Sequence, residues 1–280
     1  MEHRQFKVSR IAIYMVVAAI LLVVAGELSS SLIKHEWPTP LSQLIAGLIF
    51  AIGAIVTLKV IHSKHPSILR EIKLVGYSNK RDLIIALILP FVMTIIAFVI
   101  ALSTGLIHNI RVSTDIHIWL MFLFNCLFAV LYEAFPEEVF MRGLILSELR
   151  KRFSLIATLF IQPLLFTIFG GIVHIIANLI ELGRPELPVV LGAMVQFYLF
   201  GIVLQLYREF AGSLWANMLF HLVCLETTRF MFASSGQSII TFKETLPGYM
   251  TLLGLFFALY LGSAIILAIL IWLRNRKTLT

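Results

Sequence analysis

The 280-residue sequence is short of charge, and this shortage excludes a soluble globular domain. Charged residues make up 13% of the chain, whereas soluble domains carry about a quarter. Hydrophobic residues make up 60%, and mean hydropathy is +0.97. The chain also lacks low-complexity segments and a convincing internal repeat. The composition therefore indicates a membrane-embedded chain.

Cysteine is nearly absent as well. Cys126 and Cys224 are the only two, and both lie in apolar stretches. This count excludes a disulfide framework and a Cys/His zinc signature, and thiol chemistry is not expected. The formal net charge is +7, but no aromatic and basic surface element accompanies it. We therefore predict no nucleic-acid partner and interpret the charge as topology and contact with anionic lipid.

Long apolar stretches dominate the chain. A spanning helix needs about 20 apolar residues. Eight stretches fit that length, namely 11–32, 41–61, 83–107, 116–135, 154–180, 188–207, 212–233 and 248–273. We predict an all-α, polytopic integral membrane protein with eight transmembrane helices, in which 1–280 form a single domain. The first stretch also resembles a signal peptide, but it is longer than a typical signal core, so we expect a retained span.

Basic residues predict which loops face the cytoplasm. With the N-terminus inside, 17 of the 22 basic residues fall on the cytoplasmic side, including those of the loop 62–82 and Arg142. The five on the other side are Lys34, Arg111, Arg184, Arg229 and Lys243. Both termini are therefore predicted to be cytoplasmic. The C-terminal residues 274–280 carry no eukaryotic retention signal, so we expect a bacterial plasma membrane.

One run of charge interrupts this apolar background: Glu137-Glu138-Val139-Phe140-Met141-Arg142-Gly143. Ionisable residues within spans are costly and usually functional. On a helix, Arg142 lies one turn after Glu138, so its guanidinium can hold one carboxylate while the other faces a cavity. Pro136 directly before the pair predicts a kink or a helix restart.

Two of the eight histidines, His174 and His221, lie inside apolar stretches. A carboxylate and an imidazole can remove a proton from water, and a second imidazole can donate to the developing oxyanion. Alternatively, Glu137, His174 and His221 could bind zinc with a water in the open position. A proton relay in a transporter would use the same residue types. These residues alone leave all three chemistries open.

Three segments resemble the motifs of the CAAX protease and bacteriocin-processing (CPBP, or Abi) family: Glu137-Glu138-x-x-x-Arg142-Gly143, a stretch ending in His174, and Ser213-Leu214-Trp215 followed by His221. The resemblance covers about 116–233. The family includes eight-span intramembrane endopeptidases, among them the type II CAAX prenyl endopeptidases. It implies that Glu137 and His174 activate water, that Glu138 and Arg142 orient them, and that His221 contributes to the oxyanion hole.

The chain departs from the family pattern at two positions. The second motif places Phe four residues before its His, where this chain has Gly170, with Phe169 one residue earlier. The third motif places Asn or Asp four residues after its His, where this chain has Leu225. Asn217 lies one turn before His221 on the same helix face and is the candidate replacement donor.

The sequence thus predicts an intramembrane endopeptidase that acts in the bilayer on a membrane-embedded peptide or protein. The substrate could be a prenylated C-terminus, a bacteriocin leader or a regulatory peptide. No cofactor is assigned, and zinc stays the alternative. A catalytically silent scaffold or immunity protein for a partner membrane protein is the second reading. A transporter is disfavoured because the first half of the chain has no counterpart of Glu137-Glu138. We expect Glu137, His174 and His221 to converge, with Arg142 paired to a carboxylate.

Overall fold

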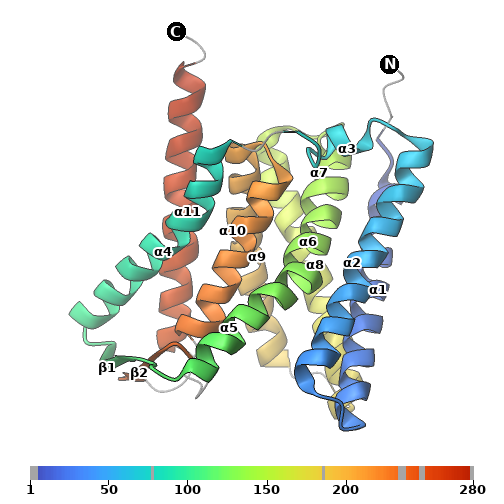
Figure 1. Ribbon diagram of the computed structural model, residues 1–280. Coiled ribbons are helices and arrows are strands. Elements are labelled where there is room, and N and C mark those ends of the chain that lie inside the picture. Colours follow the sequence, from blue (N-terminus) through green and yellow to red (C-terminus); the bar gives the residue numbers. More distant parts are fainter. Residues whose placement is uncertain (1–5, 77–78, 185–186, 233–237, 246–249, 278–280) are drawn as a thin grey trace.

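A computed structural model describes residues 6–76, 79–184, 187–232, 238–245 and 250–277, and it shows a bundle of long helices (Figure 1). Seven helical segments of the described chain are long and apolar enough to cross a membrane. They are α1 Val8–Lys34, α2 Thr39–Lys64, α4 Lys80–Ser103, the run from α5 to α7 over Ile116–Leu149, α8 Leu155–Leu182, α9 Leu187–Ala211 and α11 Met250–Lys277. The chain is an integral membrane protein.

The seventh predicted span, 212–233, corresponds to α10 (Leu214–Thr227) and the π-helical segment η3 (Thr228–Phe232). It packs against α4, α9 and α5. It is not among the seven helices that are both long and apolar enough to cross a membrane. This element is also the polar one, since it carries Asn217, His221 and Glu226, all of them buried.

The predicted span 116–135 ends too early. One helical run continues from α5 (Ile116–Ala129) through η1 (Val130–Ala134), α6 (Phe135–Glu138) and η2 (Val139–Ile145) to α7 (Leu146–Leu149). Backbone dihedrals stay helical on both sides of Pro136, so the helix does not restart there. Wide π turns, which often mark functional sites, flank the proline instead. Glu137 and Glu138 therefore lie inside a spanning helix and not at a helix N-terminus.

Local sequence signals set several helix ends. Asn79, Asp115 and Ser154 accept hydrogen bonds from the first turns of α4, α5 and α8, as expected of N-cap residues. Gly183 ends α8 in the left-handed conformation, with φ of 69°. Large apolar side chains such as Ile13, Ile95 and Ile156 point outward at more than half exposure, which suits a surface covered by lipid.

The all-α prediction is confirmed for nearly all of the described chain, and one small sheet is the exception. Strand β1 (Ile107–Val112) pairs in antiparallel fashion with β2 (Ile240–Glu244), with Ile107 opposite Glu244 and Val112 opposite Ile240. Both strands lie at the edges of apolar stretches, where hydropathy alone does not reveal them. The sheet lies at the end of the bundle opposite the two termini (Figure 1).

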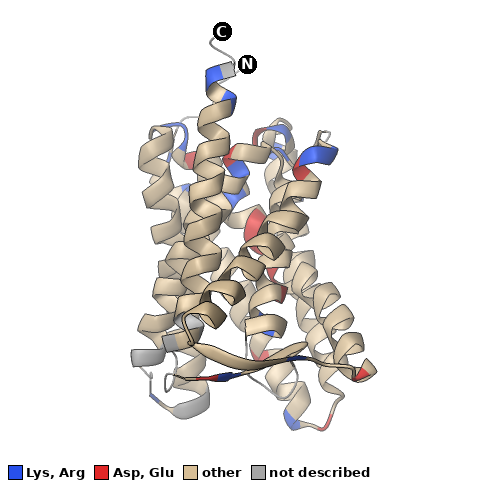
Figure 2. Ribbon diagram, turned by 90° about the vertical axis from the view of Figure 1, so that its left-hand side faces the viewer, with Lys and Arg blue, Asp and Glu red and all other residues tan. Residues whose placement is uncertain are grey.

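Both termini lie at one end of the bundle, and Lys and Arg are concentrated there (Figure 2). The short helix α3 (Ile68–Glu71) lies at that end too. This arrangement agrees with a shared side for the termini and the loop 62–82, while the cytoplasmic identity of that side stays a prediction. Arg142 is the exception, because it was assigned to the cytoplasmic loops and is fully buried within the bundle.

Candidate active site

The buried carboxylate of Glu138 organises the candidate site. Its Oε1 lies 3.1 Å from Nη1 of Arg142 and 2.8 Å from Nδ1 of His221. Its Oε2 accepts a hydrogen bond from the side-chain amide of Asn217. All four side chains are at most 1% exposed. Arg142 from the helical run Ile116–Leu149 and His221 and Asn217 from α10 thus meet at the Glu138 carboxylate. These contacts offset the cost of burying the charged groups.

Glu137 points elsewhere, because successive residues on a helix are about 100° apart. Its side chain is 13% exposed, and its Oε2 lies 4.0 Å from Nε2 of His221. That separation is too long for a direct hydrogen bond. The His221 imidazole therefore lies between two carboxylates, fixed by Glu138 at one nitrogen and facing Glu137 with the other. The ring of Phe200 packs against it edge-on, with centroids 4.9 Å apart.

The first carboxylate pair and its arginine were predicted correctly as neighbours, and the Glu138–Arg142 pairing follows the i, i+4 spacing. Asn217 also joins the site, although it contacts Glu138 and so serves to hold that carboxylate. His174 is the residue that does not join. It is exposed, its ring packs 5.5 Å from the ring of Phe197, and among the described residues it has no hydrogen-bond or ion-pair partner.

The packing of α8 on α9 explains the position of His174. Gly170 and Gly171 lie three and four residues before it, on the same helix face. A Cβ at Gly170 would lie 2.6 Å from the Phe197 ring, and one at Gly171 would lie 3.1 Å from Met194, so this face is pressed against α9. Of the three residues predicted to converge, Glu137 and His221 approach to 4.0 Å, while the contact that the structure gives His174 is with Phe197.

The three predicted zinc ligands are accordingly not assembled. The described part of the chain contains no group of three or more His, Cys, Asp and Glu side chains that could hold a metal ion. Glu137 and His221 supply two ligands at most, and zinc sites ordinarily take three or four from the protein. The described residues do not fit a metal centre.

A second cluster of charge lies beside the site and was missed because Arg229 was assigned to an outer loop. Arg229 in η3 donates to both carboxylate oxygens of Glu133, at 2.5 and 2.6 Å, and lies 3.6 Å from Glu226. The side-chain amide of Asn125 donates to both oxygens of Glu226 at 2.8 and 3.0 Å. Glu133 is one turn before Glu137, so this cluster adds polarity next to the site.

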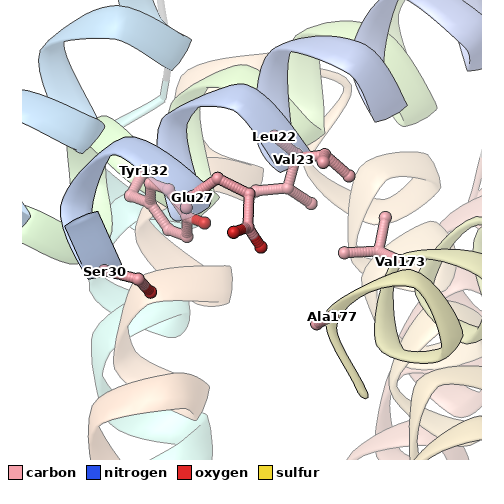
Figure 3. A pocket seen from close by; sticks show the side chains of 8 residues that line it. Leu22, Val23, Glu27, Ser30, Tyr132, Val173 and Ala177 are labelled. Carbon is pink, nitrogen blue, oxygen red and sulfur yellow. The ribbon is translucent and has the colours of Figure 1, made fainter. Parts of the chain in front are cut away.

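A pocket of about 140 Å³ lies between α1, η1 and α8. Its polar lining comes from Glu27, Ser30 and Tyr132, and Figure 3 shows the Glu27 carboxylate directed into the open space beside α8. Helices α1 and η1 approach closely here, since a Cβ on Gly26 would lie 3.1 Å from the Tyr132 hydroxyl. None of the predicted catalytic residues lines this pocket.

Residues 115–225 match the family model described as Rce1-like, type II CAAX prenyl endopeptidase Rce1-like. The central segment of this chain is similar to that family. The match confirms the resemblance drawn from the motifs, and it covers Glu137, Glu138, Arg142, Asn217 and His221. The Rce1-like family is a protease family. A search of curated proteins and a search of solved structures each found no match to the chain.

Within the matched segment, the motif Phe-x-x-x-His can also be aligned on Phe166. The guanidinium of Arg142 lies 4.3 Å from the ring centroid of Phe166, so Phe166 is the phenylalanine of α8 that contacts the buried arginine. Four residues later stands Gly170. When Phe166 is taken as the phenylalanine of the motif, Gly170 occupies the position of its histidine, so this chain has no imidazole there. His174 lies one further turn along α8.

Proposed function

We propose that this protein is an intramembrane endopeptidase that cleaves a peptide bond near the C-terminus of a prenylated, membrane-bound substrate. Three observations support the proposal: the Rce1-like match, the spanning helices, and a carboxylate that keeps some exposure beside a fixed imidazole. The last of these carries the proposal. Glu137 and Nε2 of His221 flank a gap of 4.0 Å, while Glu138 holds the other ring nitrogen.

In the proposed reaction, Glu137 takes a proton from water as the water oxygen attacks the scissile carbonyl carbon. His221, protonated on both nitrogens, donates Nε2–H to the oxyanion that develops on the carbonyl oxygen. The C–N bond then breaks, and Glu137 passes its proton to the departing amine. With His221 as imidazolium, the charges of Glu137, Glu138, Arg142 and His221 sum to zero, which suits a buried site.

Glu138, Arg142 and Asn217 position His221 in this proposal. Nδ1–H of the imidazole donates to Glu138, and this assignment follows from the short distance to a carboxylate oxygen. The resemblance assigned His174 to water activation together with Glu137. Because α8 directs His174 toward α9, the proposed step uses Glu137 and His221 instead.

A second candidate function is a catalytically silent scaffold or immunity protein that binds a partner membrane protein. Three departures from the family pattern favour it: His174 packs against Phe197, Gly170 stands where the second motif has Phe, and Leu225 stands where the third motif has Asn or Asp. Both candidates place the protein in a membrane, and a bacterial plasma membrane stays our prediction.

The test is cleavage of a farnesylated CAAX peptide by the purified full-length protein in lipid nanodiscs, followed by mass spectrometry. Wild type should release the C-terminal tripeptide, and Glu137→Gln should lower the rate by about 10²–10⁴, as expected for loss of a positioned base. Glu27→Gln, which changes a carboxylate outside the site, is the matched control and should keep the wild-type rate. Equal rates for wild type and Glu137→Gln would favour the scaffold.

A further inference from the structure

Two glutamines deep in the bundle have no partners for their amide groups. Gln162 on α8 and Gln205 on α9 are both 0% exposed. Neither the nitrogen nor the oxygen of either side chain has a hydrogen-bond partner among the described residues. Buried polar groups are nearly always hydrogen-bonded to protein or to ordered water, so two fully unpaired amides at one level of a membrane protein need an explanation.

The register of α8 against α9 places these glutamines opposite each other. A Cβ on Gly201 would lie 3.0 Å from Pro163 and 3.3 Å from Phe166, while Gly170 faces Phe197. The two helices therefore run antiparallel, and Phe166 lies across from Gly201. Gln162 is one turn before Phe166 and Gln205 is one turn after Gly201, so both side chains enter the same layer of the interface. No hydrogen bond joins them.

The same layer adjoins the buried arginine of the site. The Arg142 guanidinium lies over the Phe166 ring at 4.3 Å. Its Nη1 bonds to Glu138, but its Nε and Nη2 have no partner among the described residues. On the other side, Arg208 is one turn beyond Gln205, donates Nη2–H to the carbonyl of Ile72, and has an unpaired Nε. Unpaired donors and acceptors thus follow one another from Arg208 to Arg142.

We propose that ordered water fills this seam, which we define as Arg208, Gln205, Gln162 and Arg142, and that it links the bundle end bearing the termini to the candidate site. A buried water needs two to four polar partners, and the seam offers seven unpaired atoms. Water there completes the hydrogen bonds of the Arg142 guanidinium and so positions Glu138. The inference stands apart from peptide hydrolysis, because it rests on the unpaired groups alone.

Hydroxyl-radical footprinting by water radiolysis, read by mass spectrometry on the full-length protein in nanodiscs, tests the seam. Radicals form from water beside the labelled side chain, so the reporter is Phe166, which is 1% exposed and adjoins the seam. Phe50, at 0% exposure among apolar neighbours, is the dry control. Phe166 should be labelled several-fold faster than Phe50. Equal, slow labelling of both would overturn the proposal.

Variants then assign the water to the glutamines. Gln162→Leu and Gln205→Leu should each slow the labelling of Phe166 toward the rate of Phe50. Gln43→Leu, the same change on α2, should leave it unchanged. Unchanged Phe166 labelling in both seam variants would refute the assignment to these amides. If either leucine variant fails to fold, Gln162→Asn and Gln205→Asn are measured in its place, because asparagine keeps the amide group. Both asparagine variants should retain the labelling of Phe166, and loss of this labelling in both would contradict the proposal.

Discussion

Replacing Glu138 by leucine should be strongly destabilising, and the structure gives the reason. The substitution leaves Arg142, a fully buried cation, without its counter-charge, and it removes the acceptor for His221 and Asn217. Breaking a buried ion pair from one side costs about 3–5 kcal/mol. Each buried donor that loses its acceptor costs a further 1–3 kcal/mol or so, although the terms are not additive. We therefore expect a loss of at least about 3 kcal/mol.

A double-mutant cycle separates the pair from its surroundings. Arg142→Leu should also destabilise, and the double variant Glu138→Leu/Arg142→Leu should be less destabilised than the sum, with a coupling of about 1–3 kcal/mol, because no charge is left unpaired. Free energies of unfolding come from reversible denaturation in detergent micelles. Glu71→Leu, at an exposed position of α3, is the control and should change stability by about 0.5 kcal/mol or less. A cost for Glu138→Leu below about 1 kcal/mol, or strict additivity, would refute the reasoning.

Four further predictions address backbone strain, a buried charge, helix packing and topology. Lys73 has a left-handed φ of 55°, so Lys73→Gly should raise stability by about 1 kcal/mol in thermal unfolding while Lys73→Ala keeps the backbone strain. Burial, and next the charge of Arg208, lower the pKa of Lys73. Lys73→Ala should therefore raise the free energy of unfolding more at neutral pH, where the amine is charged, than above the ordinary titration range of lysine. An alanine variant whose effect did not change with pH in this way would contradict the prediction. Gly170→Ala should cost about 1–3 kcal/mol through overlap with Phe197, whereas Gly192→Ala, in open space, should not destabilise; equal effects would count against the α8–α9 packing. Cysteines at Lys64 and Lys151 should both be labelled by a membrane-impermeant thiol reagent from the side of the termini, and labelling from opposite sides would contradict the topology.

Much of the fold follows from composition and spacing. Hydropathy marks the spanning helices because the bilayer sets their length, and the i, i+4 spacing is sufficient to pair Arg142 with Glu138. The sequence cannot reveal the π turns on either side of Pro136, and each wide turn rotates every later side chain about the helix axis. This rotation is why the depth of Glu137 inside a continuous helix was beyond prediction, although its approach to His221 was predicted.

The position of His174 depends on how α8 packs, and that packing is a tertiary property. Phe166 and His174 lie on one face of α8, but His174 is two turns beyond Phe166, which contacts Arg142, so His174 packs against Phe197 of α9 instead. The spacing of apolar residues in the sequence identifies an apolar helix, but it does not reveal which neighbouring helix each of its faces packs against. The unpaired Gln162 and Gln205 were missed for the same reason, because polar residues of an apolar stretch gain meaning only once their partners, or lack of them, are known.

The central claim is that Glu137 and His221, held by Glu138, form the working site without His174. It is tested most directly by kcat/KM for cleavage of the farnesylated CAAX peptide by His221→Ala and His174→Ala. We predict that His221→Ala lowers kcat/KM by about 10²–10³, as for loss of a single oxyanion donor, and that His174→Ala stays close to wild type. A loss for His174→Ala as large as that for Glu137→Gln would contradict the claim.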